Sequence, residues 1–271
     1  MEFIDTNLDG ARFERVSMRG ATLHRVRLDE ARLSRMVLTG AEIRGAGFYG
    51  TRLVGVELND VTIDGDIENV VINGVDIGPL IAAELTRRDP LYGELNPTDA
   101  EGFRRAWAQI EQRWDDLTER ARALPEDTLH ASVDGEWSFI QTLRHLGFAT
   151  AAWLQRTVQG DPHPYLPLDL PWDEAPDWPA EWDMPLDRDA RPSLDEALAG
   201  RTARQRAMRE HLATLTDADL EGTVTRPEPG WPAYPDTPVL IALQTILVEE
   251  YHHHRFATRD LDALTTPQKE N

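Results

Sequence analysis

The first 63 residues place a large apolar side chain at every fifth position, and a Met, Thr, Ala or Val stands two residues before each. A period of five matches neither the 3.6 of an α-helix nor the 2 of an ordinary strand. Each unit of five is therefore expected to turn one large and one smaller side chain inward and three side chains outward. The large residues are Phe3, Leu8, Phe13, Met18, Leu23, Leu28, Leu33, Leu38, Ile43, Phe48, Leu53, Leu58 and Ile63.

The segment ATLHRVRLDEARLSR is a sample of this pattern, and over residues 1–78 the chain resembles the pentapeptide-repeat family. The resemblance implies a right-handed, four-sided β-helix, a solenoid that needs covers at its ends. A short helix over Pro79–Arg88 is expected to close the C-terminal end, and residues 89–97 to form a linker. At the Phe3 end a second copy in a two-fold homodimer is the first choice, and the chain's own helical domain the alternative.

From residue 98 the apolar spacing changes to the 4,3 pattern of amphipathic helices. One long helix is predicted from Phe103 to Leu124, and capping boxes or a Thr-Pro pair mark the helix starts. The expected architecture of residues 98–271 is an all-α four-helix bundle. The start signals are Thr98 with Glu101, Ser138 with Gln141, Ser193 with Glu196, and Thr237 with Pro238.

The connection over residues 160–192 is unusually long for a compact domain and contains eight prolines. It also carries Trp172, Trp178 and Trp182, whose large apolar area argues against disorder. We expect this segment to form a folded flap over one end of the bundle. Simple packing over the core is the alternative role.

The amino-acid composition excludes several classes of function. The net charge of −20 argues against a protein that binds the phosphate backbone of nucleic acids. Cysteine is absent, which excludes disulfides, cysteine-based zinc sites and a thiol nucleophile. No signal peptide and no stretch of about 20 apolar residues is seen, so a cytoplasmic protein without membrane contact is expected.

The last predicted helix contains the segment EEYHHHR, which is residues 249–255. Glu250 and His254 interrupt the apolar stripe that runs from Leu240 to Leu261, and side chains at i and i+4 meet on one face. A buried carboxylate beside an imidazole is costly unless the charge is matched, for example by a metal. His252 and His253 point about 100° and 200° away, and are expected at the surface or behind the ligands.

His145 lies mid-helix among apolar neighbours, with no acidic residue within four positions. Together His145, Glu250 and His254 supply two imidazoles and a carboxylate from two helices. Three protein ligands with one open position are typical of a catalytic metal site. A structural hydrogen bond between Glu250 and His254 inside the bundle is the alternative.

The segments WSFIQTLRHLGFA and EEYHHHRFA resemble those of the DinB-like (DinB/YfiT) superfamily over roughly residues 98–264. The first carries the tryptophan–serine start and the first metal histidine, here His145. The resemblance maps the family's last histidine onto His254, and places Glu250 where the family usually has a histidine. It implies a four-helix bundle that holds a divalent metal near its centre. Characterised members include transferases and isomerases that use low-molecular-weight thiols.

The leading hypothesis is thus a metal-dependent transferase acting on a small-molecule substrate with a low-molecular-weight thiol. Zinc is the first choice of metal, and nickel, manganese and iron are alternatives. A second hypothesis is a non-enzymatic binding or scaffold protein that works through the solenoid. Residues 1–78 carry 9 basic and 13 acidic residues, which supports mimicry of DNA charge only weakly.

Overall fold

The computed structural model describes residues 2–23, 26–43, 46–63, 65, 67–173, 175–182, 184–226 and 229–266. The chain divides into two compact units, Met1–Asp64 and Gly65–Asn271, which are described one at a time. The boundary places residues 65–97 with the helical part of the chain.

Backbone turns recur through the described residues of the first unit with the same period of five as the large apolar side chains. The residues with positive φ are Asp5, Gly10, Arg15, Gly20, Glu30, Arg35, Gly40, Gly50, Gly55 and Asp60. At Gly10, φ is 74°, and the amide of Ala11 donates to the carbonyl of Leu8 over 2.9 Å. That bond closes a β-turn whose third residue is left-handed, a position that glycine occupies without steric cost. In the described residues, the backbone therefore turns with the same period of five as the apolar side chains.

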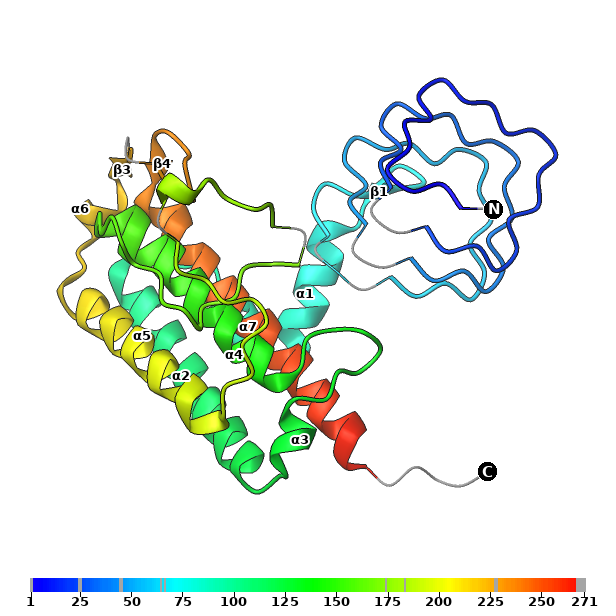
Figure 1. Cartoon of the computed structure of the whole chain (residues 1–271). Helices are drawn as coiled ribbons and strands as arrows, with labels where there is room; N and C mark the ends of the chain where they lie inside the picture. Colours follow the sequence, from blue (N-terminus) through cyan, green and yellow to red (C-terminus); the bar gives the residue numbers. More distant parts are fainter. Residues whose placement is uncertain are drawn as a thin grey trace. The chain divides into compact units, whose positions relative to one another are not determined.

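The described residues of the first unit contain no strand. The large apolar side chains at every fifth position are exposed, from 42% at Leu8 to 68% at Ile63. The four-sided β-helix that the repeat implies therefore stays a prediction, since neither its strands nor its closed apolar column is formed in this part of the structure. The unit is the blue to cyan segment of Figure 1.

The second unit begins with a hairpin and a short helix. Strands β1 (Val71–Ile72) and β2 (Val75–Asp76) pair antiparallel across a two-residue turn. The turn is Asn73-Gly74, with φ of 51° and 82°, the sequence that tight hairpins favour. Helix α1 (Gly78–Arg88) follows with a proline in its first turn, so the predicted helix over Pro79–Arg88 is confirmed. A 3₁₀ turn, η1 (Pro90–Glu94), leads into the bundle.

The rest of the second unit is built around four long helices, and the predicted helical class is confirmed. Helices α2 and α4 each pack against both α5 and α7, so the four form a closed ring of neighbours around a shared core (Figure 1). The long helices are α2 (Ala100–Arg122), α4 (Phe139–Thr150) with its π-helical continuation η2 (Ala151–Val158), α5 (Leu194–Thr214) and α7 (Val239–Thr265). The short elements are α3 (Glu126–Leu129), η3 (Ala180–Trp182), α6 (Asp217–Leu220), β3 (Thr223–Val224) and β4 (Thr237–Pro238), with β3 and β4 paired antiparallel. Among the helices of the described ranges, none combines the length and apolarity needed to cross a membrane.

Two of the four predicted helix starts are confirmed. The start predicted at Thr237 and Pro238 is early by one residue, because these residues form β4 and α7 begins at Val239 without a side-chain cap. Ser138 and Ser193 each form the predicted capping box at the start of α4 and α5. The capping box predicted at Thr98 is wrong by one residue, because the carboxylate of Asp99 accepts the amide of Gly102 over 2.7 Å and caps α2 itself.

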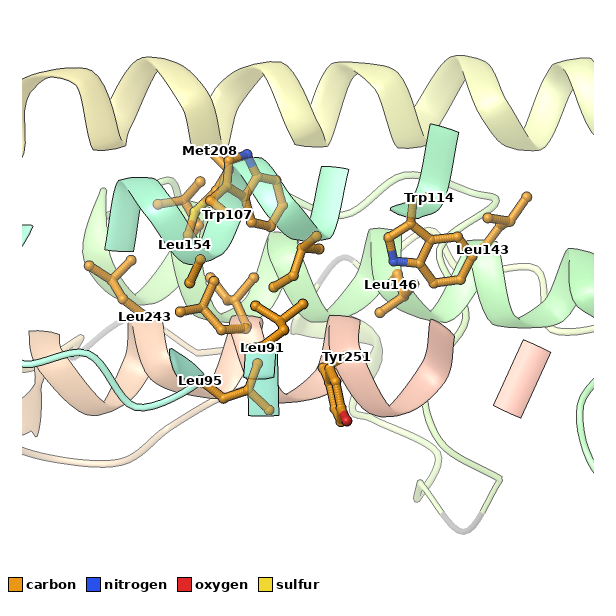
Figure 2. Close-up of a cluster of buried hydrophobic side chains, with 14 of the residues drawn as sticks. Leu91, Leu95, Trp107, Trp114, Leu143, Leu146, Leu154, Met208, Leu243 and Tyr251 are labelled. Atoms are coloured by element: carbon orange, nitrogen blue, oxygen red, sulfur yellow. The ribbon is translucent and has the colours of Figure 1, made fainter. Parts of the chain in front are cut away.

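The main core cluster lies between the four long helices, and all its buried members fall between Leu91 and Leu261. Trp107 and Trp114 of α2 pack there with Leu143 and Leu146 of α4 (Figure 2). A second cluster joins Phe148 and its neighbours on η2 to the long connection, whose Trp172 and Trp178 pack against it. Trp172, Trp178 and Trp182 are all partly buried, as expected for an ordered connection, and its role as a flap over one end of the bundle stays a prediction.

A chain that starts at Gly65 should fold on its own, because both core clusters of the second unit draw every member from residue 91 onward. Its thermal midpoint, measured by circular dichroism at 222 nm, should lie within about 3 °C of the full chain, which is roughly 1 kcal/mol for a domain of this size. Loss of cooperative unfolding in the shortened chain would contradict this division of the molecule.

Candidate metal centre

His145 lies in the middle of α4 and is only 7% exposed, in a helix whose residues are nearly all buried. Its Nδ1 lies 3.0 Å from the carbonyl oxygen of Leu170, which belongs to the flap. A carbonyl oxygen can only accept, so Nδ1 carries the proton and donates. In the neutral ring, Nε2 is then an acceptor with a free lone pair. The flap thus fixes both the tautomer and the direction of this imidazole.

Nε2 of His145 faces the carboxylate of Glu249 on α7, at 3.3 Å from Oε2. The same carboxylate oxygen lies 3.1 Å from Nε2 of His253, one helical turn further along α7. Ligand atoms of all three residues lie within 4.8 Å of one another. Among the described residues, only these three His, Asp or Glu side chains form a group with such spacing.

The contact between Nε2 of His145 and Glu249 joins two acceptors whenever the imidazole is neutral. It becomes favourable only when a proton or a metal cation lies between them. Burial by itself raises the pKa of Glu249, but the hydrogen bonds and charges of His145 and His253 outweigh it, and the net shift holds that pKa well below its usual range. The carboxylate is therefore ionised at neutral pH. The arrangement attracts a positive charge to the point where the three side chains converge.

The spacing of the three side chains fits a divalent metal. Nitrogen and oxygen ligands lie 2.0–2.2 Å from zinc, so two ligands of a tetrahedral site are about 3.4 Å apart. The two separations from Oε2 of Glu249, 3.3 Å and 3.1 Å, match that distance, and all three ligand atoms lie within 4.8 Å of one another. Two imidazoles and a carboxylate also form a donor set that zinc and other first-row metals accept. Three protein ligands leave a coordination position for a substrate.

The indole ring of Trp137 contacts both imidazoles of the cluster. Its ring centroid lies 4.4 Å from that of His145 and 5.6 Å from that of His253, on which it stacks. Its indole Nε1 donates to Oδ1 of Asp173 in the flap over 2.7 Å. Phe148 also stacks near His145, with a distance of 6.4 Å between the ring centroids. The sequence singled out Trp137 only as the start of a segment, and its contact with both imidazoles is a finding of the structure.

Of the three predicted ligands, the structure brings only His145 to the cluster. Glu250 is fully buried one position away, and both of its carboxylate oxygens accept from the guanidinium of Arg201 on α5. His254 points toward α2, where its Nε2 lies 3.2 Å from the carbonyl of Arg113 and donates to it. Burial lowers the pKa of His254, which keeps the ring neutral at pH 7. Glu249 and His253, and not Glu250 and His254, therefore join His145 in the candidate metal-binding cluster.

The correction has a simple geometric cause. Helix α7 packs against α2 and α4, so its buried face is wider than one stripe. The stripe through Glu250 and His254 faces the bundle centre, whereas the neighbouring stripe faces α4 and His145. Ala242 and Ile246, both buried, lead into Glu249 and His253 with the same 4,3,4 spacing. This second stripe was the signal in the sequence that could have located the site.

Two family models match the chain. The model of the DinB superfamily matches residues 109–257 and therefore spans His145, Glu249 and His253. The model of pentapeptide repeats matches residues 2–35 and 23–60, with eight copies. No curated protein and no solved structure matches this sequence significantly.

Protein purified without a nickel column should bind about one zinc per chain, as measured by metal analysis after dialysis against zinc. His145→Ala, Glu249→Ala and His253→Ala should each reduce this to background, because each removes one of three converging ligands. His252→Ala is the matched control, since it changes the adjacent histidine of α7, which lies outside the cluster. Equal losses in His252→Ala and His253→Ala would contradict the assignment.

Glu250→Gln should instead destabilise the protein by about 3–5 kcal/mol while leaving zinc binding in place. The substitution leaves the buried guanidinium of Arg201 without its counter-charge, which is strongly unfavourable. Urea unfolding measures the first effect and metal analysis of the folded variant the second. A Glu250→Gln protein of unchanged stability that loses its zinc would return Glu250 to the metal site.

Proposed function

The chain belongs to the DinB superfamily, and from this membership and the convergence of His145, Glu249 and His253 we propose that the protein is a metal-dependent enzyme. The observation that supports this best is the acceptor pair formed by Nε2 of His145 and the Glu249 carboxylate, which a metal cation, like a proton, would stabilise. The proposed metal is zinc, with nickel, manganese and iron as alternatives. The domain is proposed to be a four-helix bundle with this metal between α4 and α7.

The proposed reaction is the transfer of a group to or from a low-molecular-weight thiol. This chain has no cysteine, so any thiol nucleophile has to arrive with a substrate. A bound divalent metal would lower the pKa of a coordinated thiol and supply a thiolate at neutral pH. His145, Glu249 and His253 would hold the metal, and the Leu170 carbonyl would keep Nε2 of His145 directed toward it.

Aromatic side chains would shape the space for the second substrate. Trp137 stands against His145 and His253, and Phe148 joins the site to Trp172 and Trp178 of the flap. Trp178 also lines a recess of about 270 Å³ together with Asp177, Pro179, Ala180, Met184, Leu186 and Arg188. Such a surround favours a small molecule with an apolar group, which would exclude water from the reacting atoms.

A second candidate function belongs to the N-terminal unit. Eight pentapeptide repeats span residues 2–60, and none of the three residues of the metal cluster lies among them. We keep the four-sided β-helix as the proposed fold of these repeats, and a binding or docking module as their proposed role. The two functions can be tested separately. Binding of a partner by the repeats should survive the substitution His253→Ala, whereas metal-dependent activity should be lost.

Cobalt-substituted protein offers a direct test of thiol binding. Titration with a small thiol such as N-acetylcysteine should produce a sulfur-to-cobalt charge-transfer band in the near ultraviolet, since the open position accepts the thiolate. His253→Ala should show no band, and His252→Ala should show the band of the unchanged protein. A protein that binds cobalt but gives no band at millimolar thiol would disprove the thiol chemistry and leave the metal site standing.

A further inference from the structure

The flap is fastened to α4 and α5 at three places around the carbonyl that holds His145. Leu170 donates its own amide to the carbonyl of Arg144 over 3.2 Å and accepts from Nδ1 of His145. One residue of the flap therefore binds the backbone of α4 with its amide and the metal-site imidazole with its carbonyl. Any shift of Leu170 moves the acceptor that orients His145.

Arg144 fastens both arms of the flap. Its guanidinium is buried and donates to the carbonyl of Leu168 over 2.8 Å on one arm. On the other arm it donates to the carbonyls of Asp187 and Ala190, the latter over 2.7 Å. These bonds use a charged donor against neutral acceptors, which makes them stronger than ordinary backbone pairs. The residue directly before His145 thus anchors the segment that positions His145.

Asp169 fastens the flap from the other side of Leu170. Its carboxylate is 5% exposed and accepts from Arg204 of α5 over 2.7 Å and from the amide of Leu166 over 2.8 Å. Arg204 also donates to the carbonyl of Pro164 over 2.7 Å. The segment 164–170 is therefore held between two helices by buried charges, with the His145 acceptor at its end.

Gly147 provides the room for this arrangement. A Cβ added there would lie 2.7 Å from Oδ1 of Asp169, closer than real contacts allow. The carboxylate cannot give way freely, because Arg204 and the amide of Leu166 both hold it. A side chain at residue 147 would therefore displace the flap at the residue before Leu170.

We propose that the segment 164–170 is a latch that couples docking of the flap to metal binding through the tautomer of His145. When the latch is closed, Leu170 holds Nδ1 of His145 as the donor, and Nε2 faces Glu249. When it opens, the ring loses that constraint. Metal binding and latch closure must then strengthen each other by the same factor. Asp169, Arg204 and Gly147 are positioning residues in this proposal, which depends on the metal site proposed above.

Gly147→Ala tests the latch, and Gly200→Ala is its matched control. Both replace a helical glycine by alanine, but a Cβ at Gly200 meets nothing within 4 Å. Zinc affinity, measured by competition with a chromophoric chelator, should fall by about 10–100-fold in Gly147→Ala, as expected when the partner of a ligating histidine is disturbed. Gly200→Ala should bind zinc as tightly as the unchanged protein. Equal affinity in all three proteins would overturn the latch.

The unchanged protein supplies a second measurement that does not depend on the folding of a variant. Addition of zinc should slow hydrogen exchange at the amide of Leu170 and across residues 164–170, and removal of zinc with a chelator should restore the faster exchange. Zinc bound at one per chain with no change in exchange of this segment would overturn the coupling.

Nitrogen-15 spectra of the His145 ring separate failure of the latch from failure of the metal site. Without metal, the unchanged protein should show the Nδ1-protonated tautomer, and Gly147→Ala should show a mixture of tautomers. A mixture in the unchanged protein overturns the latch whether or not zinc binds. If zinc does not bind, the proposed function and the proposed coupling are both wrong. The spectra then still show whether Leu170 orients the ring of His145.

Discussion

A neutral imidazole offers one donor and one acceptor, and in His145 the carbonyl of Leu170 decides which nitrogen is which. Because Nδ1 donates to the flap, the lone pair on Nε2 faces the carboxylate of Glu249. That contact is unfavourable without a proton or a metal cation between the two groups, and His253 would complete the proposed ligand set from one turn away. The site therefore depends on a backbone carbonyl 25 residues along the chain from the ring that it orients.

Helix α7 carries two adjacent glutamates whose environments give them different roles. Glu250 lies in the core, where Arg201 matches its charge and also stacks over Trp114 at 5.2 Å. Glu249 lies at the edge facing α4, where the imidazoles of His145 and His253 approach it. A buried carboxylate that is already paired gains nothing from a metal, whereas Glu249 retains the capacity to bind one. The partner available on the neighbouring helix, and not burial alone, separates a structural residue from a ligand.

Much of the helical part could be predicted from the sequence, because capping boxes and the 4,3 spacing are local signals. Ser138 and Ser193 begin helices as expected, and His145 was identified as a polar residue on a buried helix. The choice between Glu249 and Glu250 could not be made this way. Both glutamates stand four residues before a histidine, and only the packing of α7 against α4 and α2 distinguishes the two pairs.

Two further features depended on tertiary contacts that no local pattern encodes. The role of Leu170 could not be predicted, because a backbone carbonyl leaves no trace in the residue type. Trp137 lies before α4 and meets His253 of α7 only once the helices have packed. In the first unit the sequence predicted the period of five for the side chains, and the described backbone repeats it as residues with positive φ, which needs only local geometry. The closure of those turns into a β-helix depends on contacts between coils.

The most direct test of this account is the position of a bound metal. Crystals grown with zinc and measured at the zinc absorption edge should show one strong anomalous peak per chain, about 2.0–2.2 Å from Nε2 of His145, a carboxylate oxygen of Glu249 and a ring nitrogen of His253. In the same map, Glu250 should remain paired with Arg201. A peak coordinated by Glu250 or His254, or zinc-bound crystals with no peak between α4 and α7, would contradict it.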